Sequence, residues 1–225
     1  MMAGEPETLY SDEPLNERIR RHDYDRLLML SDGVFAIAIT LLALDLVLPA
    51  HWDGSVERLM SVPGRPLVGY LFGFGLVGAF WFMHRRLFAR LERVDAGVTV
   101  LNLLLLGIIG LTPYVARMIA EAGPGRAMPF YLVAIAGVFA SIALIRGWAA
   151  MRPDLLHPQI DRRGWRSDAL AVAASALVFG SVGTWAIVQH QPVDAEVMFL
   201  MVVVLAVGRR VVRRRQAQMS STSRP

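Results

Sequence analysis

Apolar residues gather in six long stretches of this 225-residue chain, and short segments rich in charge, proline or glycine separate them. The stretches cover residues 26–48, 66–84, 97–119, 129–150, 168–189 and 194–212. An α-helix needs about 20 mostly apolar residues to cross the hydrocarbon core of a bilayer. The pattern therefore predicts an all-α protein, an integral membrane bundle of six helices.

The composition favours the same class. Hydrophobic residues make up 55% of the chain and its mean hydropathy is +0.45, whereas soluble domains are about 45 to 50% apolar. No second domain is expected. Residues 1–25 are predicted to form a polar cytoplasmic leader, residues 26–213 the transmembrane domain, and residues 214–225 a cytoplasmic tail that is expected to be disordered.

The arginines indicate an orientation, because they supply all 23 basic residues of the lysine-free chain. Nineteen lie in the leader, the second and fourth connections and the tail, and four lie in the first and third connections. Arginine is enriched in cytoplasmic loops, so both termini are predicted to be cytoplasmic. A pI near 10.1 could suggest nucleic-acid binding. Attraction of arginines beside membrane spans to anionic lipid explains it better, and no nucleic acid is expected.

Several kinds of chemistry lack the residues that they need. The chain contains no cysteine, and its five histidines are scattered without the spacing of a metal site. Gly180-Ser-Val-Gly183 is not a nucleophile elbow, and no glycine-rich phosphate loop follows a strand. The sequence therefore predicts no enzyme, no metal and no cofactor.

The first apolar stretch is unusual because it contains a polar pair, Ser31-Asp32. An aspartate in the membrane interior costs about 2.5 to 3.5 kcal/mol on insertion scales, so it needs a polar partner or a water-filled path. Trp81 and His84 of the second stretch and Asn102 of the third are expected at a similar depth. Buried polar groups must be satisfied, so these five residues are predicted to form an interhelical network.

Helical periodicity separates this pair from an aliphatic stripe. At about 100° per residue, Leu41 and Leu44 fall within about 40° of Ile37, while Thr40 lies about 60° to one side. Asp32 lies about 140° from the stripe, and Ser31 about 120° away on the other flank. The pair is therefore expected to point into neighbouring helices, with the acid against His84 and Asn102.

Two further features concern packing. Gly69 and Gly73 form a row of small residues that suits close helix contacts, either within one subunit or between subunits. Pro113 is expected to bend the end of the third helix, because proline lacks an N–H group and cannot continue the helical hydrogen bonds.

The first stretch resembles bacterial members of the transmembrane-protein-175 family of potassium channels. Their first helix starts with Arg-x-x-x-Phe-Ser-Asp, followed by Gly-Val-Phe-Ala-Ile and a threonine. The matching residues here are Arg26, Ser31, Asp32, Gly33, Val34, Phe35, Ala36, Ile37, Thr40 and Asp45. Leu30 stands where the family has phenylalanine. Trp81, His84, Asn102, Thr112-Pro113 and the length of a single six-helix repeat extend the resemblance.

This resemblance implies a homotetramer in the bacterial inner membrane, with four first helices around a central pore and potassium ions, lipid and its own copies as partners. Ile37, Leu41 and Leu44 would form a hydrophobic constriction that resists strongly hydrated ions. Thr40 would tune selectivity, and Asp45 near the outer mouth would concentrate cations. The implied function is a potassium-permeable cation channel, although the chain has no Thr-Val-Gly-Tyr-Gly loop.

Alternatives remain at this point. A proton-coupled secondary transporter would also place Asp32 and His84 in the membrane, although neither inverted repeats nor paired interrupted helices are evident. A non-conducting structural membrane subunit is the other alternative. The polar network either only locks helices together or also serves gating or proton movement, and Asp45 is either a pore acid or a helix-end anchor.

Overall fold

The computed structural model describes residues 15–46, 53–55, 64–194 and 196–197, and within them the chain is helical with no β-strand. The elements are α1 (Leu15–Leu42), η1 (Ala43–Asp45), α3 (Gly64–Phe88), α4 (Ala96–Gly110), α5 (Thr112–Ala122), α6 (Pro124–Met151), η2 (Pro153–Leu155) and α7 (Arg162–Val188). Almost all of the sixth predicted stretch and the whole predicted tail lie outside the described residues. The count of six helices stays a prediction.

The first five predicted stretches all coincide with helices. α1 begins at Leu15, earlier than the predicted start of the first span. The third stretch is interrupted at Leu111, and Pro113 lies in the first turn of α5, where its missing N–H costs least. The structure thus has a helix interruption beside Pro113, and the predicted bend itself stays a prediction. Within the described residues, three stretches are long and apolar enough to cross a membrane: Ala96–Ile119, Gly125–Met151 and Arg162–Val188.

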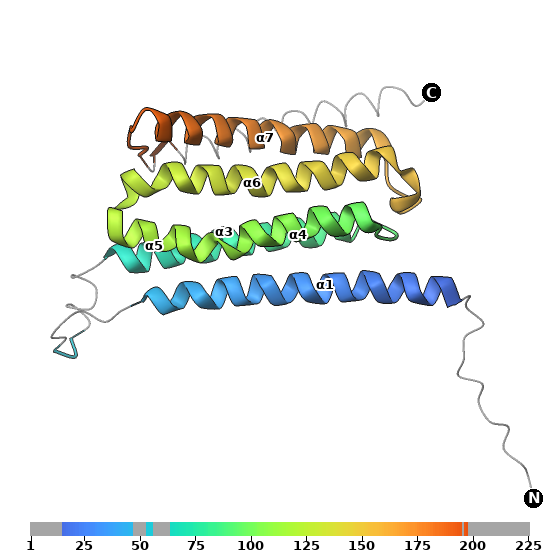
Figure 1. The fold of residues 1–225 in the computed structure, drawn as a ribbon, viewed down its shortest axis with the longest axis horizontal. Helices are drawn as coiled ribbons and strands as arrows, with labels where there is room; N and C mark the ends of the chain where they lie inside the picture. Colours follow the sequence, from blue (N-terminus) through green and yellow to red (C-terminus); the bar gives the residue numbers. More distant parts are fainter. Residues whose placement is uncertain (1–14, 47–52, 56–63, 195, 198–225) are drawn as a thin grey trace, which may run out of the picture.

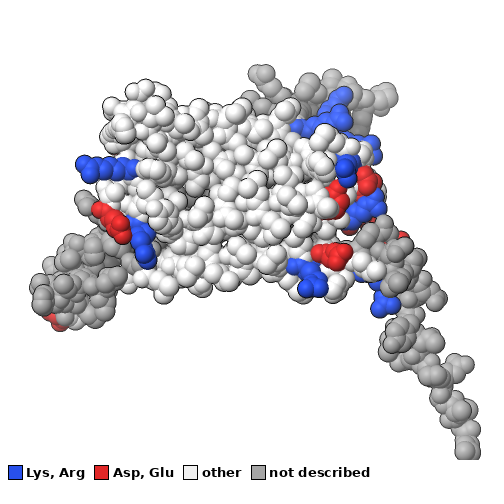
Figure 2. Space-filling model, in the orientation of Figure 1, with Lys and Arg blue, Asp and Glu red and all other residues white. Residues whose placement is uncertain are grey.

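The helices lie side by side, with α1 at one edge, α3, α4 and α5 in the middle, and α6 and α7 at the other edge (Figure 1). The start of α1, the α3–α4 connection and the α6–α7 connection share one end of the bundle (Figure 1). We call it the arginine-rich end, because Arg85, Arg86, Arg90, Arg93, Arg152, Arg162, Arg163 and Arg166 lie in or beside these connections. Charged side chains gather at both ends of the visible face, and the band between them is uncharged (Figure 2).

α6 and α7 pack against each other at glycines. A Cβ atom on Gly183 would lie 2.9 Å from both the Cβ of Leu132 and the carbonyl oxygen of Pro129. A Cβ atom on Gly180 would lie 3.4 Å from that of Ala136. Small residues let the two backbones approach closely, which favours association where lipid removes the hydrophobic driving force.

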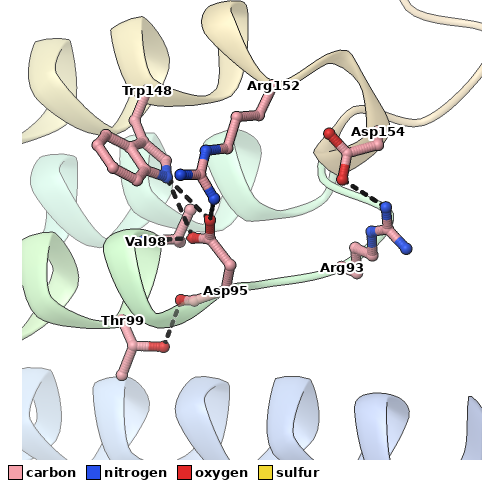
Figure 3. Close-up of polar contacts among 7 residues, drawn as sticks. All are labelled: Arg93, Asp95, Val98, Thr99, Trp148, Arg152 and Asp154. Carbon is pink, nitrogen blue, oxygen red and sulfur yellow. Dashed lines mark hydrogen bonds and ion pairs between the residues drawn. The ribbon is translucent and has the colours of Figure 1, made fainter. Parts of the chain in front are cut away.

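A polar cluster holds the start of α4 against the end of α6 (Figure 3). The Asp95 carboxylate accepts hydrogen bonds from Val98 N (2.8 Å), Trp148 Nε1 (3.0 Å) and an Arg152 guanidinium nitrogen (2.9 Å). Arg152 also lies 4.5 Å above the centre of the Trp148 ring. Partial burial acts to raise the pKa of Asp95, but these hydrogen bonds and the Arg152 charge together hold it below its ordinary value of 3.8.

The two connections at the arginine-rich end are also joined directly. Glu92 N donates to Leu155 O over 2.9 Å, and Arg93 pairs with Asp154 (Figure 3). At the arginine-rich end, the α3–α4 and α6–α7 connections are therefore joined through the backbone as well as through side chains.

Candidate functional site

The buried side of α1 packs on α3 and α4. Its buried residues are Leu27, Ser31, Phe35, Ala38 and Leu42. Leu42 lies against Gly73 of α3, where an added Cβ would come within 3.1 Å of both Leu42 methyl carbons. The row of small residues on α3 therefore serves packing within one subunit at Gly73.

The opposite side of α1 is uncovered within the described chain. The exposed fractions are 59% for Ile37, 42% for Leu41 and 72% for Leu44, which lies in η1 directly after α1. Leu30, which replaces the family phenylalanine, is 48% exposed on the same side. The aliphatic stripe located by periodicity is thus the side of α1 that no other described helix covers.

Three buried polar side chains connect α1, α4 and α3 in series. Ser31 Oγ donates to Leu27 O (2.8 Å), and Asn102 Nδ2 donates to Ser31 Oγ (2.9 Å). His84 Nε2 lies 2.9 Å from Asn102 Oδ1, and an amide oxygen can only accept, so Nε2 carries the proton. The exposed fractions of Ser31, His84 and Asn102 are 0%, 1% and 0%. We call Ser31, Asn102 and His84 the polar chain, and its hydrogen bonds satisfy polar groups that water cannot reach.

Two aromatic rings fix the His84 imidazole in place. The ring of Phe35 on α1 lies 5.4 Å from the imidazole centre, and that of Phe88 lies 4.4 Å away. Both phenylalanines are about 1% exposed. Sequence reasoning did not assign them to the site, although Phe35 belongs to the matched signature.

The structure corrects the partner expected for Asp32. Its carboxylate accepts a hydrogen bond from Trp81 Nε1 (2.8 Å) and is exposed, whereas Ser31 is the residue that reaches Asn102. The reason is the step of about 100° between successive helical residues, which directs Ser31 toward α4 and Asp32 toward α3. Arg85 stacks 5.7 Å from the centre of the Trp81 ring on the same exposed flank.

The remaining predicted residues lie along α1 and at its end. Thr40 is exposed, and its hydroxyl donates to Ile37 O over 2.9 Å, so the hydroxyl oxygen keeps its lone pairs for another partner. Arg26 is exposed one to two turns before Asp32. Asp45 ends η1, and its side chain lies outside the description.

These features define a class of protein, a helical membrane bundle whose first helix is held by buried polar bonds on one side and leaves an apolar stripe open on the other. No group of three or more His, Cys, Asp or Glu residues is placed to hold a metal ion in the part of the chain that the structure describes.

The family model described as the endosomal/lysosomal potassium channel TMEM175 matches residues 26–113. A potassium channel of Streptomyces collinus is 32% identical over 160 residues, which cover 68% of this chain and 77% of that protein. The chain belongs to the TMEM175 family.

Two other comparisons show similarity to a longer relative and to a solved structure. An endosomal/lysosomal proton channel TMEM175 of Danio rerio is 28% identical over 185 residues, which cover 76% of this chain and 34% of the longer fish protein. A crystal structure of the potassium channel MtTMEM175 superimposes with a TM-score of 0.57 at 19% identity. This likeness covers 84% of this chain and 93% of the other, and it establishes a shared fold.

Proposed function

We propose that this chain is one subunit of a potassium-permeable cation channel in which the open stripe of α1 lines the ion path. Membership of the TMEM175 family and the potassium channel of Streptomyces collinus support the assignment. The observation that carries the proposal is the contrast between the two sides of α1. Buried hydrogen bonds fix one side, and the other side presents Ile37, Leu41 and Leu44 to whatever lies beyond the subunit.

The assembly that fits this stripe is a homotetramer. One helix cannot enclose a path, and the exposed residues Ile37, Leu41 and Leu44 repeat at intervals of four and three, which keeps them on one line. Four copies of α1 around an axis would bring these lines together as rings. We place the tetramer in the bacterial inner membrane with both termini in the cytoplasm.

Rings of Ile37, Leu41 and Leu44 would form a hydrophobic constriction that gates by dewetting. Ions must shed water to pass such a ring, and potassium gives up its water more easily than sodium. The lone pairs of the Thr40 oxygen would replace part of that water, since the Thr40 proton is already donated to Ile37 O. Asp45 is proposed to attract cations at the outer mouth.

The buried polar chain would act as a positioning device for the constriction. Hydrogen bonds are directional, so Ser31, Asn102 and His84 favour one rotation of α1 about its axis. A different rotation would strand Ser31 against apolar side chains and turn the stripe away from the axis. Asp32 and Trp81 add a second hydrogen bond on the exposed flank.

Proton conduction is the second candidate function, because the Danio rerio relative is named a proton channel and this chain has Asp32 on α1 and His84 on the neighbouring α3. Secondary transport and a non-conducting structural role remain as alternatives. The transporter differs from both channels in having a fixed stoichiometry between coupled ions.

Recording from purified full-length protein in planar bilayers tests the proposal. With potassium on one side and sodium on the other, we expect unitary currents whose reversal potential lies toward the potassium equilibrium potential. With symmetrical potassium and a pH gradient, a reversal potential near zero favours potassium, and one that follows the proton gradient favours the second candidate. A folded oligomer that passes no current would contradict both.

A further inference from the structure

A cavity of about 380 Å³ lies between α3, α6 and α7 near the arginine-rich end. Its volume falls in the range of about 300 to 1,000 Å³ that is typical of small-molecule sites. The charged lining residues are Arg86, Arg90, Arg146 and Asp168, and its apolar wall includes Ile142 and Val172. None of these residues belongs to the α1 site described above.

The lining carries more positive than negative charge. Asp168 Oδ2 lies 3.5 Å from an Arg90 guanidinium nitrogen and 3.8 Å from one of Arg146. Arg86, on α3, adds a third guanidinium to the lining. The lining therefore holds three guanidinium groups and one carboxylate, and this excess of positive charge favours an anion.

Arg146 is the most buried of the charged residues that line the cavity. It is 7% exposed, and its guanidinium lies 4.8 Å from the centre of the Trp165 ring. Trp165 Nε1 in turn donates to the Arg146 carbonyl oxygen over 2.9 Å. A guanidinium that is already ordered loses little entropy when it binds an anion, and its planar fork matches the oxygens of phosphate.

The cavity lies toward the arginine-rich end of the bundle, where charged residues border the apolar spans. Arg86 lies in the last turn of α3 and Arg90 directly after that helix, where the apolar span gives way to charge, and Ile142 and Val172 lie further into the bundle. Basic pockets between membrane helices bind the head groups of anionic lipids, with the acyl chains along the apolar side.

We propose that this cavity binds a phosphate group, carried either by an anionic phospholipid head group or by soluble phosphate. Binding would link α3 to the α6–α7 pair, because the cavity is lined from all three helices. His84 and Trp81 lie on the same helix as Arg86, so the bound phosphate would also stabilise α3, against which α1 packs.

Thermal unfolding and native mass spectrometry of the full-length protein in dodecyl maltoside test the proposal without any ion-flux measurement. Phosphatidylglycerol, phosphatidylcholine and inorganic phosphate are titrated separately. We expect phosphatidylglycerol to raise the unfolding midpoint and to stay bound in the spectrometer, and phosphatidylcholine to do neither. Protection by inorganic phosphate as well would support a site for soluble phosphate, and protection by phosphatidylglycerol alone would support a head-group site.

The variants move the binding in opposite directions. Arg86→Gln combined with Arg90→Gln should weaken the apparent affinity for the protective ligand by about tenfold or more, since hydrogen bonds between charged groups are stronger than those between neutral groups. Asp168→Asn should strengthen it, because the lining loses its carboxylate. Arg166→Gln is the matched control, an exposed arginine of α7 outside the lining set.

The measured quantity is the change that the ligand produces in each variant, so a difference in stability without ligand does not obscure it. The proposal is wrong if the double variant responds to phosphatidylglycerol as Arg166→Gln does. It is also wrong if phosphatidylcholine protects as well as phosphatidylglycerol.

Discussion

The contact between α6 and α7 and the contact of α1 with α3 and α4 hold their helices in two different ways. At the seam, Gly180 and Gly183 bring two backbones together and the contact is one of shape. Where α1 packs on α3 and α4, Asn102 of α4 is hydrogen-bonded both to Ser31 of α1 and to His84 of α3. Both α1 and α7 have exposed side chains on the side away from these contacts, so the two regions differ in how the helix is held and not in whether its far side is covered.

The difference follows from what each contact can specify. Packing through small residues is strong when two long surfaces match, but it demands that both surfaces be covered. Hydrogen bonds are directional and need only a few positions. A helix that must present one side to an ion path can therefore be oriented by a short polar chain, which leaves the opposite side free of contacts from its own subunit.

The largest effect is expected from breaking the polar chain at its centre. Asn102→Leu removes the donor to Ser31 Oγ and leaves the His84 N–H without an acceptor, and an unsatisfied buried polar group costs about 1 to 3 kcal/mol. Unfolding in a titration with denaturing detergent should shift accordingly. Leu104→Ala, at an exposed position of the same helix, is the control and should change little. Equal stability of Asn102→Leu and wild type would show that the hydrogen bonds among Ser31, Asn102 and His84 do not stabilise the fold.

A smaller loss is expected at the seam. Gly183→Ala places a Cβ 2.9 Å from Leu132 and from a backbone oxygen, and overpacking of this kind costs about 1 to 3 kcal/mol. Gly75→Ala is the matched control, because nothing lies within 4 Å of its added Cβ and alanine favours the helix. The same unfolding titration should separate the two variants, and a Gly183→Ala protein as stable as Gly75→Ala would argue against close backbone packing.

Asp32→Ala should have a modest effect, since Asp32 is exposed and loses one hydrogen bond, worth about 1 kcal/mol. Trp81→Phe removes the donor and keeps an aromatic ring. Because both changes break the same bond, the double variant should cost less than the sum of the two single variants in a double-mutant cycle. Strict additivity would mean that the Asp32–Trp81 bond contributes nothing to folding.

The smallest effect is expected at Asp95, where the fold ties α4 to α6. The lowered pKa of Asp95 means that its contribution is present above the ordinary value of 3.8 and is lost as pH falls through the folded value. Asp95→Asn keeps a helix-capping side chain but lacks the charge that faces Arg152. Hydrogen exchange of residues 96–100 should be faster in the variant at pH 6, with the difference shrinking below pH 4. A difference that is constant with pH would contradict the charge argument.

Features that depend on one helix were predictable from the sequence. The burial of Ser31 and the exposure of Ile37 and Leu44 both follow from the period of about 3.6 residues per turn. The helical stretches followed from length and hydropathy, and the break before Pro113 from the chemistry of proline.

Features that depend on how helices are offset along one another were not predictable. The hydrogen bond between Asp32 and Trp81 requires the relative height of α1 and α3, which no local pattern encodes. The cavity lined by Arg146 and Asp168 requires three helices to meet at one level. The polar cluster at Asp95 joins residues more than fifty positions apart.

The central claim is that the open stripe of α1 lines the ion path, and Ile37→Asn tests it most directly. A polar ring at this position should hold water and raise sodium permeability relative to potassium, so the reversal potential under a potassium/sodium gradient should move toward zero. Leu177→Asn, at a position of α7 that is 73% exposed, is the matched control and should leave the reversal potential unchanged. An Ile37→Asn channel that conducts with the wild-type reversal potential would place the ion path elsewhere.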